Sequence, residues 1–431
     1  MNSLNKKIFI NRNFACLWLG QIFSSFGEYL FSTIVIIWLI VDIFKDSSFL
    51  TTAVASIVLA TAIPRMVFSI VAGTWADRLL PVYVMITADI MRSVTFIIFM
   101  LLYLTYSLSA LQLLVTLLIL LFFNGIMAQF FNASRQTVMQ LVIPSERRIE
   151  ASSKSMFALT GIAVITGAIG PSIFLLLGPL WVLVINILTF LSSMICICFI
   201  KNLQTRPKKT VQHPSFWCEL WEGLQFTWNH KKIRVLAIGV ALYGFTLGIN
   251  NVMLSIYSLK TLGFSAVEYG WILTAFPIGG AVATFLVKLL SKVIPLYKLF
   301  SISLILLGCG YLAYALTPPL FLAWCLLFLC GILFSLFAIL QGPILQIEVT
   351  NSYMGRVSST ITSILAFSSL IGTAMTSQSV NNIVDSLIIL LNIPLTVYGA
   401  YIFIAGLLLI VGGLYLLYTQ HTRKTKIKAT F

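Results

Sequence analysis

The sequence predicts an all-α integral membrane protein whose twelve transmembrane helices form two pseudo-symmetric six-helix bundles. Composition is the first reason, because 59% of the 431 residues are hydrophobic and 9% are charged, whereas a soluble domain carries about 25% charged residues. The second reason is that apolar runs of the roughly 20 residues needed to cross a bilayer recur along the whole chain. No alternating pattern typical of a membrane β-barrel accompanies them, which leaves helices as the spanning elements.

The apolar runs define the individual helices in order along the chain. We expect spans near residues 14–40, 49–73, 83–106, 111–131, 153–177, 181–200, 235–259, 269–288, 299–316, 320–341, 358–378 and 395–418. The segment Ser386–Ile393 is apolar but too short to cross, so we expect an outer loop or interfacial turn there. The basic start of the chain precedes an apolar run that is too long for a signal peptide, so this run is expected to remain as the first span.

The basic residues predict how the spans are oriented. Of the 27 Lys and Arg residues, 23 lie in segments on one side of the predicted membrane, Lys45 and Lys260 lie on the other, and Arg65 and Arg92 lie inside spans. Because cytoplasmic loops carry the excess of Lys and Arg, both termini are expected in the cytoplasm. The formal net charge of +15 then reflects this topology and contact with anionic membrane lipid. No folded basic domain indicates a nucleic-acid partner.

An internal repeat supports the division into halves. Shifting the sequence by 206 positions aligns the loop at 140–155 with the loop at 346–361, and Gln140 then meets Gln346. Two equivalent bundles around a central cavity are what alternating access requires. The expected domains are a six-helix bundle at residues 1–200, a cytoplasmic linker at 201–234, and a second six-helix bundle with a basic tail at 235–431.

The linker has a helical pattern of its own. Aromatic and leucine residues recur at helical spacing between Phe216 and Trp228, just before Lys231 and Lys232. This pattern predicts a short amphipathic helix that lies in the membrane interface and tethers the two halves.

The loop after the second predicted span carries a specific pattern. Gly73, Asp77 and Arg78 are spaced as Gly-x-x-x-Asp-Arg, and at this point the sequence resembles the major facilitator superfamily. The resemblance implies the major facilitator fold and a cytoplasmic gate in which Asp77 faces Arg356. A glycine permits close helix approach, and a carboxylate can cap a helix or pair with a cation. The basic run that usually follows in the family is replaced by apolar residues at 79–83, which argues against a charge relay beyond Asp77.

Further stretches, among them "TAIPRMVFSIVAGTWADR", "LVIPSERRIEASS" and "SAVEYG", resemble the branch that contains macrolide exporters and enterobactin-type siderophore exporters. In the fifth predicted span, Gly167, Gly170 and Pro171 are similar to the antiporter signature of drug exporters, although its trailing glycine pair is absent. The resemblance covers nearly the whole chain and implies export across a bacterial plasma membrane. A purely structural helix kink explains Gly170 and Pro171 equally well.

Glu28 lies about half way along the first predicted span, in the stretch "QIFSSFGEYLFSTIVIIWLI". A charge at mid-membrane costs on the order of 3 kcal/mol, so an ionisable residue there is a candidate functional residue facing an aqueous cavity. Burial favours the protonated carboxyl, and water or a cation favours the charged form, which is the chemistry that a proton-coupled antiporter needs. Alternatively, Glu28 pairs with Arg65 or hydrogen-bonds to a Ser or Thr and thereby locks the first bundle.

Asp89 is the second candidate proton-coupling residue, and it lies three residues before Arg92 in the third predicted span. This spacing places the two side chains on one helix face, where their charges can neutralise each other. Arg65, in the second span, is expected at a similar depth. The pattern therefore favours a structural cluster of Arg65, Asp89 and Arg92 over a proton-carrying role for Asp89.

Amphipathic side chains inside the predicted spans are the candidates for substrate contact. A cavity lined by aromatic and amide groups with one carboxylate would suit a moderately hydrophobic neutral or cationic compound. Residue type alone does not separate cavity-facing from lipid-facing positions. The candidates are Gln21, Tyr29, Trp38, Tyr243, Asn250, Asn251, Trp271 and Gln341.

Together these features predict a secondary active transporter that exports a small amphiphilic compound, such as a macrolide-like drug, a peptide antibiotic or a siderophore, in exchange for protons. A proton-coupled nutrient importer and a lipid or cell-wall precursor flippase remain open as alternatives. No phosphate-binding Gly-x-x-x-x-Gly-Lys-Ser/Thr loop occurs, which argues against ATP drive. No catalytic cluster indicates an enzyme, and the seven Cys and three His are not grouped as metal ligands, so we expect no cofactor. We expect a monomer.

Overall fold

The computed structural model describes residues 10–78, 80–144, 147–200, 216–316, 318–349, 354–376, 386 and 395–428. Within these ranges, twelve helices are long and apolar enough to cross a membrane, and the same ranges contain no β-strand. The predicted all-α membrane fold is therefore confirmed. The turn predicted at Ser386–Ile393 lies, apart from its first residue, outside the described residues.

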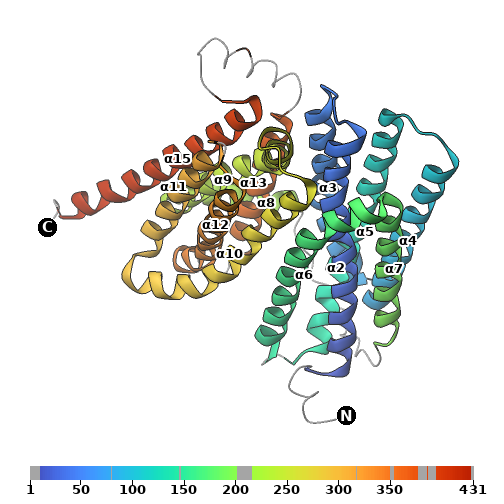
Figure 1. The fold of residues 1–431 in the computed structure, drawn as a ribbon. Coiled ribbons are helices and arrows are strands. Elements are labelled where there is room, and N and C mark those ends of the chain that lie inside the picture. Colours follow the sequence, from blue (N-terminus) through green and yellow to red (C-terminus); the bar gives the residue numbers. More distant parts are fainter. Residues whose placement is uncertain are drawn as a thin grey trace. The chain divides into compact units, whose positions relative to one another are not determined.

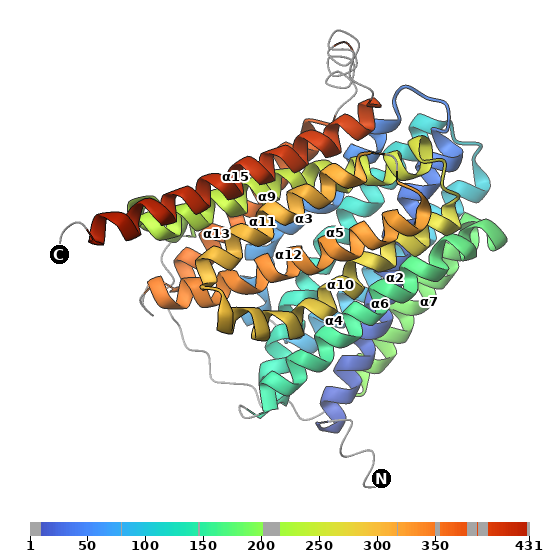
Figure 2. The same cartoon turned by 60° about the vertical axis from the view of Figure 1, so that its left-hand side comes forward.

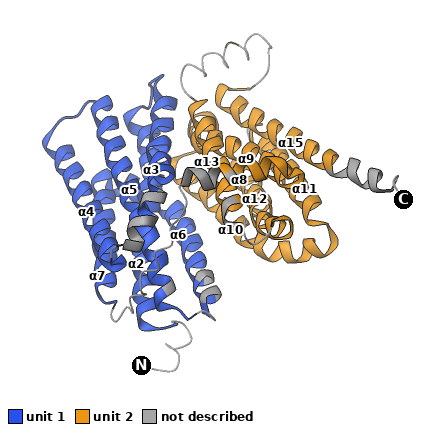
Figure 3. Ribbon diagram, turned by 180° about the vertical axis from the view of Figure 1, so that it is seen from behind, with its two compact units in different colours: residues 1–209 blue, residues 210–431 orange. Residues whose placement is uncertain are grey.

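The chain divides into two compact units, Met1–Lys209 and Thr210–Phe431, which Figure 3 shows in blue and orange. The boundary falls within the segment predicted as a linker. The helices of the first unit, labelled in Figure 1, are α2 (Arg12–Trp38), α3 (Leu50–Arg78), α4 (Pro81–Thr105), α5 (Ala110–Val142), α6 (Arg148–Leu177) and α7 (Pro179–Cys198). Those of the second unit, labelled in Figure 1 and, apart from α8, in Figure 2, are α8 (Phe216–Asn229), α9 (Lys231–Ile256), α10 (Ala266–Val293), α11 (Leu296–Tyr314), α12 (Leu320–Glu348), α13 (Met354–Ala374) and α15 (Val397–Lys428).

The two units repeat the same helix pairings. In the first unit, α2 packs against α6 and α7, α4 packs against α5 and α7, and α3 packs against α5. In the second unit, α9 packs against α13 and α15, α11 packs against α12 and α15, and α10 packs against α12. The first spanning helix of each unit also ends in a π-helical turn, Leu39–Ile43 after α2 and Tyr257–Thr261 after α9. The predicted pseudo-symmetry therefore extends through the whole bundle and is not limited to the loops.

Glycine residues allow the helices of the second unit to approach closely. A Cβ atom added at Gly248 of α9 would overlap the carbonyl oxygen of Ser369 in α13, and one added at Gly372 of α13 would overlap the carbonyl oxygen of Phe245 in α9. Lipid supplies no hydrophobic driving force for helix association, so helices in a membrane associate through close packing. Small residues allow this packing because they let the two backbones come into van der Waals contact. The pairing of α9 with α13 therefore depends on glycine at these two positions.

A small ion cluster fixes the start of α6. Glu150 accepts hydrogen bonds from Arg147 Nε (2.9 Å) and Nη2 (3.0 Å) and from Lys154 Nζ (2.7 Å). The hydrogen bonds from Arg147 and then from Lys154 lower the pKa of Glu150 to about 2, and the contact with Glu150 raises the pKa of Arg147. Spacings of three and four residues along a helix bring such side chains together. The sequence therefore indicated this cluster, but its basic residues were used only to predict orientation.

The Glu150→Gln variant is expected to unfold at a slightly lower temperature than the native protein near neutral pH, and this difference is expected to disappear in acid. A glutamate carboxyl in the unfolded chain titrates near about 4.3, above its folded value of about 2. The stabilisation is thus fully present above about pH 5 and is lost as the pH falls toward about 2. The effect is small because Arg147 and Glu150 are 39% and 37% exposed. Unfolding midpoints of both proteins in detergent across this range check the prediction, and a difference independent of pH contradicts it.

Candidate functional site

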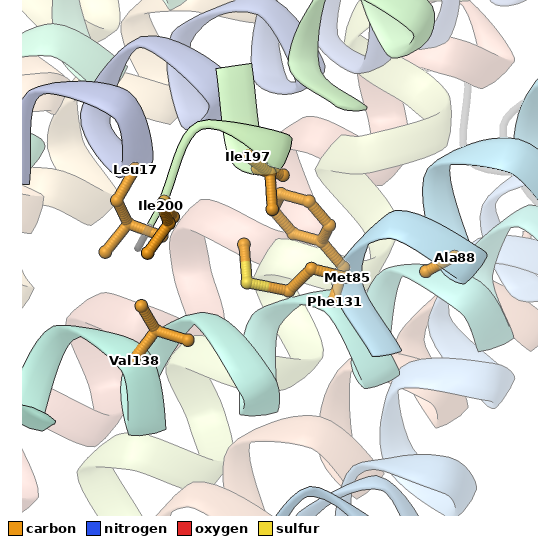
Figure 4. Packing of buried hydrophobic residues seen from close by; sticks show 7 residues of the cluster. All are labelled: Leu17, Met85, Ala88, Phe131, Val138, Ile197 and Ile200. Atoms are coloured by element: carbon orange, nitrogen blue, oxygen red, sulfur yellow. The ribbon is translucent and has the colours of Figure 1, made fainter. Parts of the chain in front are cut away.

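A packed apolar cluster in the first unit supports the candidate site. Its members come from α2, α4, α5, α7 and the residues just after α7, and Figure 4 shows them from close by: Leu17, Met85, Ala88, Phe131, Val138, Ile197 and Ile200. All are buried, and protein interiors of this kind are packed as densely as organic crystals. Ala88 directly precedes Asp89 on α4, so this packing fixes the backbone from which the Asp89 side chain extends.

Asp89 and Arg92 form a buried ion pair on α4. Asp89 is 0% exposed and Arg92 is 1% exposed, and Asp89 Oδ1 lies 3.6 Å from Arg92 Nη1. Ser193 Oγ on α7 donates a hydrogen bond to Asp89 Oδ2 (2.6 Å), and Arg92 Nη1 donates one to Ser24 Oγ on α2 (3.0 Å). Since a buried charge is tolerated only when it is paired and hydrogen-bonded, this network compensates both groups and ties α2, α4 and α7 together.

Aromatic rings complete the surroundings of Arg92. The central carbon of its guanidinium lies 5.2 Å from the ring centroid of Phe131 on α5 and 5.3 Å from that of Phe190 on α7. A guanidinium within about 6 Å of a ring centroid is attracted by the negative face of the ring. Arg92 Nε and Nη2 make no hydrogen bond within the described residues, so the two rings are the main further contacts of this cation.

Arg65 does not join the pair, contrary to the cluster of three residues expected from the sequence. Its side chain is exposed, and among the described residues no ion pair links it to Asp89 or to Glu28. The physical reason is that α3, which carries Arg65, packs mainly against α5, whereas α4 packs against α5 and α7. Similar depth in the bilayer therefore did not make Arg65 and Asp89 neighbours.

Glu28 belongs to a polar stripe on α2. Residues Gln21, Ser24 and Glu28 follow each other at intervals of three and four, which places them on one helix face. Gln21 Oε1 accepts a hydrogen bond from Arg135 Nη1 on α5 (3.0 Å), and Ser24 accepts the one from Arg92. Each of these two polar groups thus meets an arginine of a neighbouring helix, and Glu28 is the third member of the stripe.

The carboxylate of Glu28 differs from that of Asp89 in having no fixed partner. It is half-buried, and within the described part of the chain no ion pair or side-chain hydrogen bond is formed by it. Ser32 Oγ donates to the backbone carbonyl of Glu28 (2.8 Å) and leaves the carboxylate untouched. Of these two acids, Asp89 is therefore paired with a cation, and Glu28 has no such partner among the described residues.

The sequence matches the Major Facilitator Superfamily over residues 17–373. The chain belongs to this family. It is 23% identical over 312 residues to the multidrug efflux pump Tap of Mycolicibacterium fortuitum, which covers 70% of this chain and 75% of that protein.

Solved transporter structures share the fold. The nucleoside transporter NupG matches with a TM-score of 0.69 and 12% identity, over 94% of this chain and 98% of that chain. The D-xylose-proton symporter matches with a TM-score of 0.68 and 14% identity, over 95% and 97% of the two chains. This protein is therefore a multi-pass membrane transporter of small molecules and is not an enzyme.

The structure separates the candidate substrate-contacting residues of this superfamily member into two groups. Trp38 is 2% exposed, and its Nε1 donates to Asp42 Oδ2 (3.1 Å). Tyr243 is 2% exposed and stacks on Phe334, with ring centroids 4.8 Å apart. Both therefore pack inside their own unit, as Gln21 and Asn250 also do. The side chains at a surface are Tyr29, Asn251 and Trp271.

The predicted gate and kink residues occupy helices of this transporter. Gly73, Asp77 and Arg78 lie in the last turns of α3, and Arg356 lies in the first turn of α13, but their side chains lie outside the described residues. Gly167, Gly170 and Pro171 lie within α6, which continues through Pro171. A Cβ atom at Gly170 would lie 3.1 Å from Leu30 Cδ1, so this glycine lets α6 approach α2.

Sequence reasoning missed three partners in the candidate site, namely Ser24, Arg135 and Ser193. Arg135 was counted with the loop residues, but it lies inside α5, before the end of the apolar span at Met139. A basic residue within an apolar helix was the available signal. No comparable signal marked Ser24 and Ser193, because a serine hydroxyl in a helix can instead hydrogen-bond to a backbone carbonyl of its own helix.

Proposed function

We propose that the protein is a proton-coupled exporter of small amphiphilic compounds, neutral or cationic, and that Glu28 carries the proton. One observation carries the proposal, which is the difference between Glu28 in α2 and Asp89 in α4. Asp89 is neutralised by Arg92 at 3.6 Å, whereas Glu28 is half-buried in the middle of its span without an ion pair among the described residues. A carboxyl that alternates between a dry and a wet environment binds and releases a proton.

Export is the direction that the similarity to the efflux pump Tap favours, since 70% of this chain aligns with it. In an exporter driven by protons, substrate and proton bind in turn and cross in opposite directions. A compound of the drug, peptide antibiotic or siderophore type fits a site in the first unit that offers the carboxylate of Glu28 and the exposed ring of Tyr29. Efflux of this kind would confer antibiotic resistance.

The placement in the cell is part of the same proposal. The excess of Lys and Arg on one side favours cytoplasmic termini and a cytoplasmic linker at residues 201–234. In this orientation Asp77 lies at the cytoplasmic end of α3 and Arg356 at that of α13, and we propose each as a cytoplasmic gate residue. We propose a bacterial plasma membrane location and a functional monomer.

The experiment that tests this function measures proton and substrate movement together in sealed vesicles containing the purified native protein. Macrolides, lipophilic cations and siderophores are added in turn to vesicles with a preset proton gradient, and internal pH and internal substrate are followed. We expect proton and substrate to move in opposite directions for at least one of these classes. Movement in the same direction would identify an importer, and lipid flipping without proton movement would identify a flippase; either result overturns the proposal.

A further inference from the structure

Helix α8 exposes an apolar face that its own unit does not cover. Trp221, Leu224 and Trp228 are 68%, 38% and 64% exposed, and their spacing places them on one side of the helix. Thr227, at the edge of this face, is 1% exposed, and α8 packs against α13 and α9. Two tryptophans pointing away from the packed side form a surface that is costly to leave in water.

Basic groups border this apolar face at the point where α8 meets α9. The central carbon of the Arg234 guanidinium lies 6.0 Å from the ring centroid of Trp228, and Arg234 Nη1 donates to the carbonyl oxygen of Trp228 (3.5 Å). Lys231, the first residue of α9, has an exposed side chain. The contrast is Lys232, whose ammonium is already bound to Glu348, which also accepts from the hydroxyl of Tyr297. Among the described residues, Lys231 and Arg234 are thus cations close in the chain to Trp228 and without an acidic partner.

The position of α8 beside a membrane span and the basic residues around it indicate what binds to this face. The α9 span begins at Lys231, directly after α8, so the exposed tryptophans lie at the level where a membrane span starts. Residues 201–234 carry seven Lys or Arg and two Glu. Tryptophan is enriched at the membrane interface, and basic residues beside a span attract anionic headgroups.

We propose that the face formed by Trp221, Leu224 and Trp228, together with Lys231 and Arg234, is a docking surface for anionic phospholipid. The indole rings insert at the headgroup level, and the two cations bind the lipid phosphates. This docking sets the depth of α9, the first span of the second unit. It is independent of which compound the transporter moves and of how transport is driven.

The test compares two variants of the full chain, each removing one part of the surface. Lys231→Gln/Arg234→Gln removes the charges, and Trp221→Ser/Trp228→Ser removes the apolar anchors. Trp181→Ser is the matched control, because Trp181 is 55% exposed on α7 and belongs to no proposed site. The midpoint of thermal unfolding in detergent is measured while phosphatidylglycerol or phosphatidylcholine is added, since a ligand that binds the folded state raises this midpoint.

We expect phosphatidylglycerol to raise the native midpoint more than phosphatidylcholine does, and salt to reduce this difference. The charge variant should lose the difference between the two lipids, the tryptophan variant should respond weakly to both, and the Trp181→Ser control should behave as native. The two variants are independent, so failure of one to fold leaves the other decisive. An unchanged lipid response in a folded variant overturns the proposal. A native dimer that the tryptophan variant converts to a monomer also overturns it, because the face would then bind a second copy.

Discussion

Substrate-driven proton movement is expected to disappear in the Glu28→Gln variant and to fall to the level of vesicles without protein. Glutamine has nearly the same size as glutamate, but its amide group cannot bind or release a proton near neutral pH. The variant should still fold and bind substrate, because the carboxylate holds no ion pair or side-chain hydrogen bond within the described residues. A pH-sensitive dye enclosed in the vesicles measures the proton flux, and substrate binding to the same preparation is measured separately.

The matched control for this variant is Glu268→Gln, which makes the same chemical change at the start of α10. Glu268 Oε2 accepts from the backbone nitrogen of Ser265 (2.8 Å) in a capping box, and glutamine preserves such a box. Native flux is therefore expected in Glu268→Gln. If Glu28→Gln keeps native coupled flux, Glu28 is structural and the search for the coupling group moves to Asp89.

The largest loss of stability is expected for Arg92→Met, which leaves the carboxylate of Asp89 buried without its cation. Removing one partner of a buried ion pair costs about 3–5 kcal/mol, because the remaining charge is uncompensated. Ser24 also loses the hydrogen bond from Arg92 Nη1. We expect a clear fall in the unfolding midpoint in detergent, together with a lower yield of folded protein.

A second substitution separates charge from packing in this prediction. The double variant Asp89→Asn/Arg92→Met removes both charges and should recover most of the lost stability, since a buried pair replaced by neutral groups of similar volume is often tolerated. Arg65→Met is the matched control, because Arg65 is exposed, and surface changes of this kind shift stability by less than about 0.5 kcal/mol. Equal midpoints for Arg92→Met and Arg65→Met would mean that Asp89 does not depend on Arg92.

The features that the sequence predicted correctly are those that depend on residues close together in the chain. Twelve apolar runs of sufficient length became twelve spans, because a bilayer imposes this length on every helix that crosses it. The pairing of Asp89 with Arg92 follows from a spacing of three residues on one helix. Both conclusions hold without knowledge of which helices are neighbours.

The features that the sequence did not predict depend on helix rotation and on neighbours far away in the chain. Gln21 meets Arg135 across 114 residues, and no local pattern indicates that contact. Trp38 and Tyr243 proved to be buried, although residue type fits a substrate cavity equally well. Spans that are apolar on all sides carry little periodicity, so their sequences do not show which face is turned inward.

The helix pairings have a consequence for how the protein is made. The first helix, α2, has its main partners in α6 and α7, which are synthesised last within the first unit. Contacts between segments distant in the chain form late, because the loop between them must be closed first. The face of α2 that packs on α7, which includes Gly27 opposite Thr189, must therefore wait in the membrane, or beside the insertion machinery, until the final helix arrives. The same holds for α9 with α13 and α15, so a ribosome that stalls before the last helix of either unit leaves that unit's first helix without its main partners.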